Sequence, residues 1–132
     1  MSERPVQAFP EHQKTISELK KAVSKLGISI DSLVLYGSVA RGQDRGIDSD
    51  IDILVIGKDE TKSSYEKIRA LATDIDLKNS TATSIVYFSR KEIERDMKLD
   101  SPFLAEVMKE GVPLYDNGTF ERLRAGVVKI IR

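Results

Sequence analysis

Apolar residues along the chain alternate between stripes at helical spacing and short continuous runs. A helical stripe of Ile16, Leu19, Val23 and Leu26 precedes Gly27, which predicts a helix from Glu11 onward. The β-branched apolar run at 28–36 lies between two glycines and predicts a buried strand. The later predicted elements are a short helix at 39–41, a strand at 50–56, a helix carrying Tyr65, Ile68, Ala72 and Ile75, a strand at 83–88, two helices, an extended segment at 112–115 and a last helix carrying Phe120, Leu123, Val127 and Ile130 or Ile131.

Polar residues mark where three of these helices begin. Ser89 followed by Glu92 matches a capping box, so a helix is expected directly after Ser89. Ser101-Pro102 predicts a second start, because proline fits the first helical position. Asp116 or Asn117 is expected to cap the last helix.

This order of elements predicts an α/β (α+β) fold with a small mixed sheet of three to four strands and helices packed mainly on one face. We expect residues 1–10 to form a flexible tail and residues 11–132 to form one domain that includes the N- and C-terminal helices. The apolar stripe of the last helix either closes the core or forms a dimer seam. The sequence therefore leaves open whether the chain forms a homo-oligomer.

Composition narrows the classes of function. The 21 basic and 21 acidic residues cancel, so the chain lacks the basic footprint of a nonspecific nucleic-acid binder. With no cysteine and a single histidine, His12, a metal site of thiolates or several histidines is excluded, and His12 itself is expected to be exposed and idle. No apolar run is long enough to span a membrane, and the first ten residues do not resemble a signal peptide, so we expect a cytoplasmic protein.

Candidate chemistry begins where the first predicted strand ends. Gly37 and Ser38 turn the chain from the strand into a short helix, whose free N–H groups and positive dipole end attract phosphate. Glycine allows a ligand to approach the backbone, and Ser38 adds a hydroxyl donor. Arg41 could contact phosphate oxygens through two N–H groups.

Two carboxylates follow at the start of the next predicted strand. Asp50 and Asp52 should share one face of that strand, with Cα atoms about 6.6 Å apart from two strand rises. Such a pair can bind one or two divalent cations, and oxygen ligands beside a phosphate favour Mg²⁺ or Mn²⁺. Ser49 could bind phosphate or orient a carboxylate. The competing interpretation is an ordinary turn beside solvated aspartates, which the joint spacing of the two features disfavours.

The segment Gly37-Ser38-x-Ala40-Arg41-Gly42 followed by Ser49-Asp50-x-Asp52 resembles the signature of the nucleotidyltransferase superfamily, which includes DNA polymerase β, and in particular its minimal nucleotidyltransferase branch. The resemblance implies that Gly37 and Ser38 hold the nucleoside triphosphate and that Asp50 and Asp52 hold Mg²⁺. Members of this branch often pair with a helical partner protein of the HEPN type, and some act as antitoxins that adenylylate it. The resemblance therefore suggests ATP as donor and a protein as acceptor.

One feature departs from the family pattern. Catalytic members usually carry a third carboxylate on the third core strand, and the predicted strand at 83–88 places Ser84, or Thr83, at that position. Asp76 is the alternative if the strand starts earlier, although the stripe of Ile68, Ala72 and Ile75 favours a helix there. A hydroxyl cannot act as a carboxylate base near neutral pH.

Two functions therefore remain at this point. The first is a Mg²⁺-dependent nucleotidyltransferase that moves a nucleoside monophosphate, AMP from ATP, to a hydroxyl acceptor with release of pyrophosphate. The second is a catalytically weakened module that binds nucleotide or partner, such as an antitoxin that acts by binding alone. The sequence does not specify the acceptor, the base of the nucleotide, or whether the chain is active without a partner.

Overall fold

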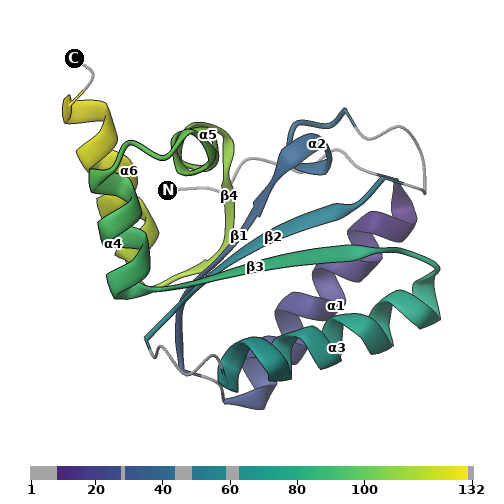
Figure 1. Cartoon of the computed structure of the whole chain (residues 1–132). Coiled ribbons are helices and arrows are strands. Elements are labelled where there is room, and N and C mark those ends of the chain that lie inside the picture. Colours follow the sequence, from purple (N-terminus) through teal and green to yellow (C-terminus); the bar gives the residue numbers. More distant parts are fainter. Residues whose placement is uncertain (1–8, 28, 44–48, 59–62, 131–132) are drawn as a thin grey trace.

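The computed structural model describes residues 9–27, 29–43, 49–58 and 63–130, with no side chains described beyond Gly126. Within these ranges, no helix is both long enough and apolar enough to cross a membrane. The elements, labelled as in Figure 1, are α1 (Pro10–Leu26), β1 (Ile30–Tyr36), α2 (Gly37–Ala40), β2 (Ile51–Gly57), α3 (Ser63–Asn79), β3 (Thr83–Ser89), α4 (Arg90–Lys98), α5 (Pro102–Glu110), β4 (Val112–Asp116) and α6 (Thr119–Ile130).

The four strands form one mixed sheet in the order β3-β2-β1-β4. β1 runs antiparallel to both of its neighbours, whereas β2 and β3 are parallel. A parallel pair needs a long crossover, and α3 supplies it between β2 and β3. The α/β class and the mixed sheet predicted from the sequence are confirmed.

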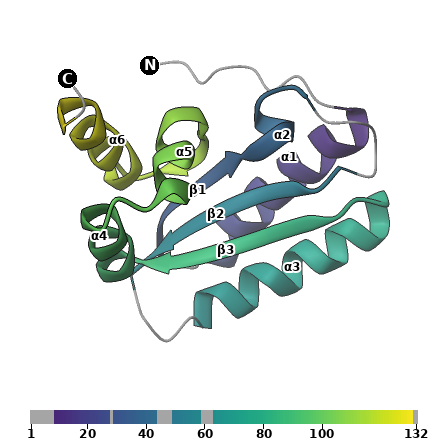
Figure 2. The same cartoon turned by 45° about the horizontal axis from the view of Figure 1, so that its top comes forward.

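Helices cover both faces of the sheet. α1 and α3 pack on one face against Leu33, Leu35 and Ile53, and α4, α5 and α6 pack on the other against Val34 and Leu54. The expectation of helices mainly on one face does not hold, because the two long helices share one face and the shorter C-terminal helices gather over one end of the opposite face (Figure 2). β1 and β2 are buried on both sides for this reason, which explains the continuous apolar runs at 33–36 and 53–56.

The predicted helix starts are confirmed. Ser89 and Glu92 form both hydrogen bonds of a capping box at α4. The Ser101 hydroxyl accepts a hydrogen bond from the N–H of Leu104 at α5. At α6, the carboxylate of Asp116 accepts from the N–H of Phe120, at 3.0 Å. These contacts join residues three or four positions apart, so the local sequence was sufficient to predict them.

The expectation for His12 was wrong. Its side chain is fully buried and lies edge-on to Phe9, with ring centroids 6.1 Å apart. α1 begins at Pro10, so His12 belongs to the first helical turn and extends the buried stripe of Ile16 and Leu19. A residue that continues a helical stripe faces the core even when it lies next to a terminal segment.

Candidate functional site

Gly37 is the first residue of the short helix α2 and follows directly on β1. Its backbone is left-handed, with φ of +79°. A Cβ built at this position would overlap Oδ2 of Asp52. Both the backbone angle and the lack of space require glycine. The turn and the carboxylate are therefore packed directly against one another, although they lie fifteen positions apart in the sequence.

Asp52 is the second residue of β2 and pairs across the sheet with Tyr36, the last residue of β1. It is half-buried, and burial raises its pKa, with a further rise from the negative charge of Asp50 and an opposing effect from Arg41. A divalent cation at the two carboxylates would relieve the repulsion between them. Because carboxylate oxygens are the donors that Mg²⁺ prefers, the residues present fit this ion.

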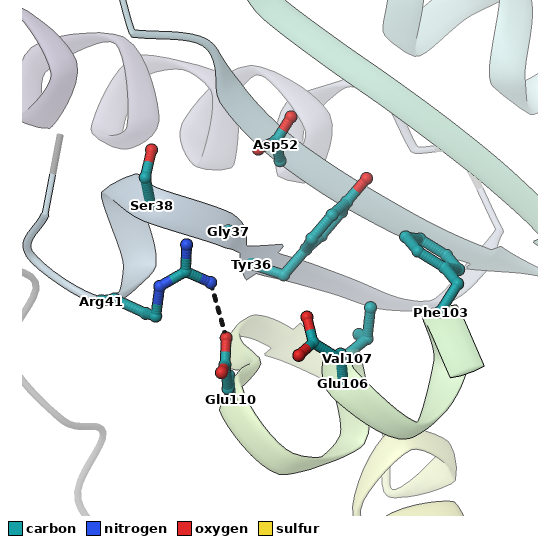
Figure 3. Close-up of a pocket in the computed structure, with 9 residues that line it drawn as sticks. All are labelled: Tyr36, Gly37, Ser38, Arg41, Asp52, Phe103, Glu106, Val107 and Glu110. Carbon is teal, nitrogen blue, oxygen red and sulfur yellow. Dashed lines mark hydrogen bonds and ion pairs between the residues drawn. The ribbon is translucent and has the colours of Figure 1, made fainter. Parts of the chain in front are cut away.

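A pocket of about 360 Å³ opens in front of Asp52. The sheet and α2 form one wall of it and helix α5 forms the opposite wall (Figure 3). α5 is held there by its buried side, Leu104, Val107 and Met108. The pocket is lined by Tyr36, Gly37, Ser38, Arg41, Asp52, Phe103, Glu106, Val107 and Glu110.

Arg41 is oriented by two partners. Its Nη1 lies 2.8 Å from Oε2 of Glu110 on α5, and its Nε donates to Oε1 of Gln43 at 3.0 Å. The planar guanidinium has five N–H donors, so these contacts leave others for an anion in the pocket. The ion pair also ties the turn after β1 to the opposite wall.

Aromatic side chains close the other end of the pocket. Burial, together with the charge of Asp52, raises the pKa of Tyr36 to about 12, so its hydroxyl keeps its proton at neutral pH. The Tyr36 ring meets Phe103 edge-on, with centroids 5.4 Å apart, and Phe103 stacks on Phe88 at 6.4 Å. Phe103 stays 37% exposed, which leaves an apolar surface for a planar ligand.

A comparison with known protein families identifies residues 16–114 as a nucleotidyltransferase domain, which is three-quarters of the chain. The chain belongs to this nucleotidyltransferase family. The matched segment includes the Gly37 turn, Asp52 and the whole sheet except the end of β4.

Solved structures with the same fold come from toxin–antitoxin complexes. One, a toxin–antitoxin with AMP-PNP, is 18% identical over 88% of this chain and 86% of the other, with a TM-score of 0.58. A second, the toxin–antitoxin MntA–HepT, is 16% identical over 90% and 86%, with a TM-score of 0.54. A third, a tri-AMPylated HEPN toxin of Shewanella oneidensis in complex with an MNT antitoxin, is 18% identical over 86% and 80%, with a TM-score of 0.53. No curated protein sequence matches the chain.

The pocket gathers four of the six residues predicted from the sequence, namely Gly37, Ser38, Arg41 and Asp52. Asp50 comes directly before β2, is exposed, and does not line the pocket. Ser49 is half-buried and also lies outside the lining. The sequence also offers Arg45 and Asp48 as residues that could approach a phosphate, with a surface role as the default, and both lie outside the described residues.

Helix α5 supplies the part of the site that sequence reasoning missed. Phe103, Glu106, Val107 and Glu110 follow the i, i+3, i+4, i+7 spacing of a single helix face, so the pattern was visible in the sequence. The two acids were overlooked because spacing does not say which element a helix face meets.

The pairing of β2 with β3 shows which residue stands where a third carboxylate was expected from the family pattern. Asp52 is in register with Ser84, so an exposed hydroxyl occupies the neighbouring position on β3. Asp76 as a third ligand is wrong, because it lies in α3 and its carboxylate accepts from the N–H of Thr83 at 2.8 Å. Among the described residues, no three acidic or histidine side chains lie close enough together to bind a metal ion.

Proposed function

We propose that the protein is a Mg²⁺-dependent nucleotidyltransferase that moves AMP from ATP to a hydroxyl on a partner protein, with release of pyrophosphate. The main support is the contact between the Gly37 turn and the Asp52 carboxylate at the head of a pocket. The backbone that we assign to phosphate binding and the side chain that we assign to metal binding are thus neighbours. Membership of the nucleotidyltransferase family supports the class of reaction.

The residues of the pocket have separate tasks in this proposal. The backbone after Gly37 and the Ser38 hydroxyl donate hydrogen bonds to the triphosphate. Arg41 binds its negative charge, with Glu110 and Gln43 fixing the orientation of the guanidinium. Asp50 and Asp52 hold Mg²⁺, which when bound neutralises charge on the phosphates as the leaving group departs. The exposed face of Phe103 offers a surface for the adenine ring.

A partner protein of the HEPN type is proposed as the acceptor. The support is the fold shared with chains of HEPN toxin–antitoxin complexes, one of which contains a tri-AMPylated toxin. A hydroxyl side chain on such a partner would enter the pocket from its open side.

The second candidate is a binding module that has lost transfer. It is favoured by one observation, the hydroxyl of Ser84 beside Asp52 where a third carboxylate would lie. In this version the protein binds ATP or its partner and transfers nothing. The variant Ser84→Asp discriminates between the two, because a gain of transfer would reveal a lapsed site. Ser80→Asp, an exposed position after α3, is the control for added charge.

The proposed function is tested by calorimetric titration of Mg²⁺-ATP into the protein and into Asp50→Asn/Asp52→Asn. We expect Mg²⁺-dependent binding to the natural chain and its loss in the double variant, with both proteins folded by circular dichroism. A second experiment follows transfer of label from ATP labelled at the α-phosphate. Absence of Mg²⁺-ATP binding by the folded natural chain would contradict both the enzyme and the nucleotide-binding version.

A further inference from the structure

Transfer of AMP is accelerated by a group that removes the proton of the attacking hydroxyl, and Ser84 cannot act as that group. The register of β2 and β3 places Ser84 directly beside Asp52, so the usual position for a base carries only a hydroxyl. Its proton is lost far above neutral pH. If the protein is an enzyme, the base must come from another element.

Most other carboxylates around this part of the sheet are already engaged. Asp31 is fully buried and accepts hydrogen bonds from Arg90 and Asn117. Glu110, which shares the pocket, is paired with Arg41. The further carboxylates bound elsewhere are those of Asp76, which accepts from Thr83 at the start of β3, of Glu92 in the capping box of α4, and of Asp116, which accepts from Phe120 in the first turn of α6.

Glu106 differs from these acids in both position and contacts. It lies one helical turn before Glu110 on α5 and lines the same pocket as Asp52, Gly37 and Ser38. Figure 3 shows its carboxylate on the side of α5 that faces Arg41 and Tyr36. It is exposed, and it forms no hydrogen bond or ion pair within the described part of the chain. No described residue therefore competes for the Glu106 carboxylate.

The location of Glu106 suits a base better than a metal ligand. It is on the wall opposite the sheet, and the described residues include no group of three acids close enough to share an ion. A hydroxyl group entering the pocket between α5 and Asp52 would have phosphate on one side and Glu106 on the other. General bases act on the far side of the nucleophile in this way.

We propose that Glu106 is the general base of the transfer reaction, an inference that rests on the proposed nucleotidyltransferase function. The acceptor oxygen forms a bond to the α-phosphorus of ATP as the bond from that phosphorus to the bridging oxygen breaks. The hydroxyl proton passes to the Glu106 carboxylate and then to water, and pyrophosphate leaves with the electron pair. α5 thus provides the carboxylate that β3 lacks.

The test compares the natural chain with Glu106→Gln, using Mg²⁺-ATP and measuring pyrophosphate release. Water serves as one acceptor and hydroxylamine as the other, because hydroxylamine attacks without prior loss of a proton. We expect Glu106→Gln to reduce release to water by about 10²–10⁴-fold, with unchanged Mg²⁺-ATP affinity and unchanged hydroxylamine-dependent release. Glu94→Gln, an exposed position on α4 outside the pocket, is the matched control.

The outcomes separate the two proposals. If the natural chain releases no more pyrophosphate than Asp50→Asn/Asp52→Asn with either acceptor, the base assignment is overturned, because Glu106 then assists no reaction, and the calorimetric titration of Mg²⁺-ATP decides separately whether the nucleotide site stands. If the natural chain is active and Glu106→Gln matches it with water, the base assignment alone is overturned. An equal loss with both acceptors, or a loss of ATP affinity, would also overturn it. A loss confined to water supports it.

Discussion

Replacing Gly37 with alanine tests whether the turn and the carboxylate form one unit. The left-handed backbone at φ of +79° costs an alanine about 1–2 kcal/mol. Moving the Asp52 carboxylate away from the new Cβ adds about 1–3 kcal/mol, as overpacking does elsewhere. We therefore expect Gly37→Ala to lower the free energy of unfolding by about 2–5 kcal/mol and to weaken Mg²⁺-ATP binding, because Asp52 is displaced.

Gly27→Ala is the matched control for this prediction. Gly27 has a similar backbone, with φ of +68°, but a Cβ there would have no atom within 4 Å. It should lose only the backbone contribution of about 1–2 kcal/mol and bind Mg²⁺-ATP normally. Urea unfolding gives both stabilities, and calorimetry gives both affinities. Equal stability losses together with equal Mg²⁺-ATP affinities would refute the argument that Gly37 is required by its contact with Asp52.

Two further predictions concern contacts away from the pocket. Buried Asp31 accepts hydrogen bonds from Arg90 and Asn117. Asp31→Asn should therefore lower the free energy of unfolding by about 1.5–3 kcal/mol, the value of hydrogen bonds to a charged group. A change within about 0.5 kcal/mol in urea unfolding would contradict this. A hydrogen bond from Asn79 lowers the pKa of Glu18 below its ordinary value of 4.5, so the stability it contributes is present above that pH and is lost as the pH falls through the lowered pKa. Glu18→Gln should therefore reduce the difference between the melting temperatures at pH 6 and pH 3, and an unchanged difference would refute the assignment.

The local features of the fold could be predicted because they depend on residues close together in the sequence. The capping box of Ser89 and Glu92 spans three positions, and the short helix after Gly37 follows from the turn itself. His12 was within reach of the same reasoning. The helix expected from Glu11 already included it, and its spacing of four from Ile16 and seven from Leu19 puts it on the buried stripe, as the structure shows.

Contacts between distant segments could not be obtained in the same way. The sequence left Thr83, Ser84 and Asp76 open for the position beside Asp52, and only the strand register selected Ser84. In a sheet, a shift of one residue moves every side chain to the opposite face, so composition alone cannot decide such a question.

By itself, the sequence determined the α/β class, most helix starts and the motif of Gly37 and Asp52, because periodicity, caps and motif spacing are properties of neighbouring residues. The tertiary structure decided that Gly37 touches the Asp52 carboxylate and that α5 brings Glu106 to the same pocket. Glu106 lies more than fifty positions from Asp52 in the chain. What brings α5 there is the burial of Leu104, Val107 and Met108 against the sheet and its neighbouring helices, a packing that depends on the whole core.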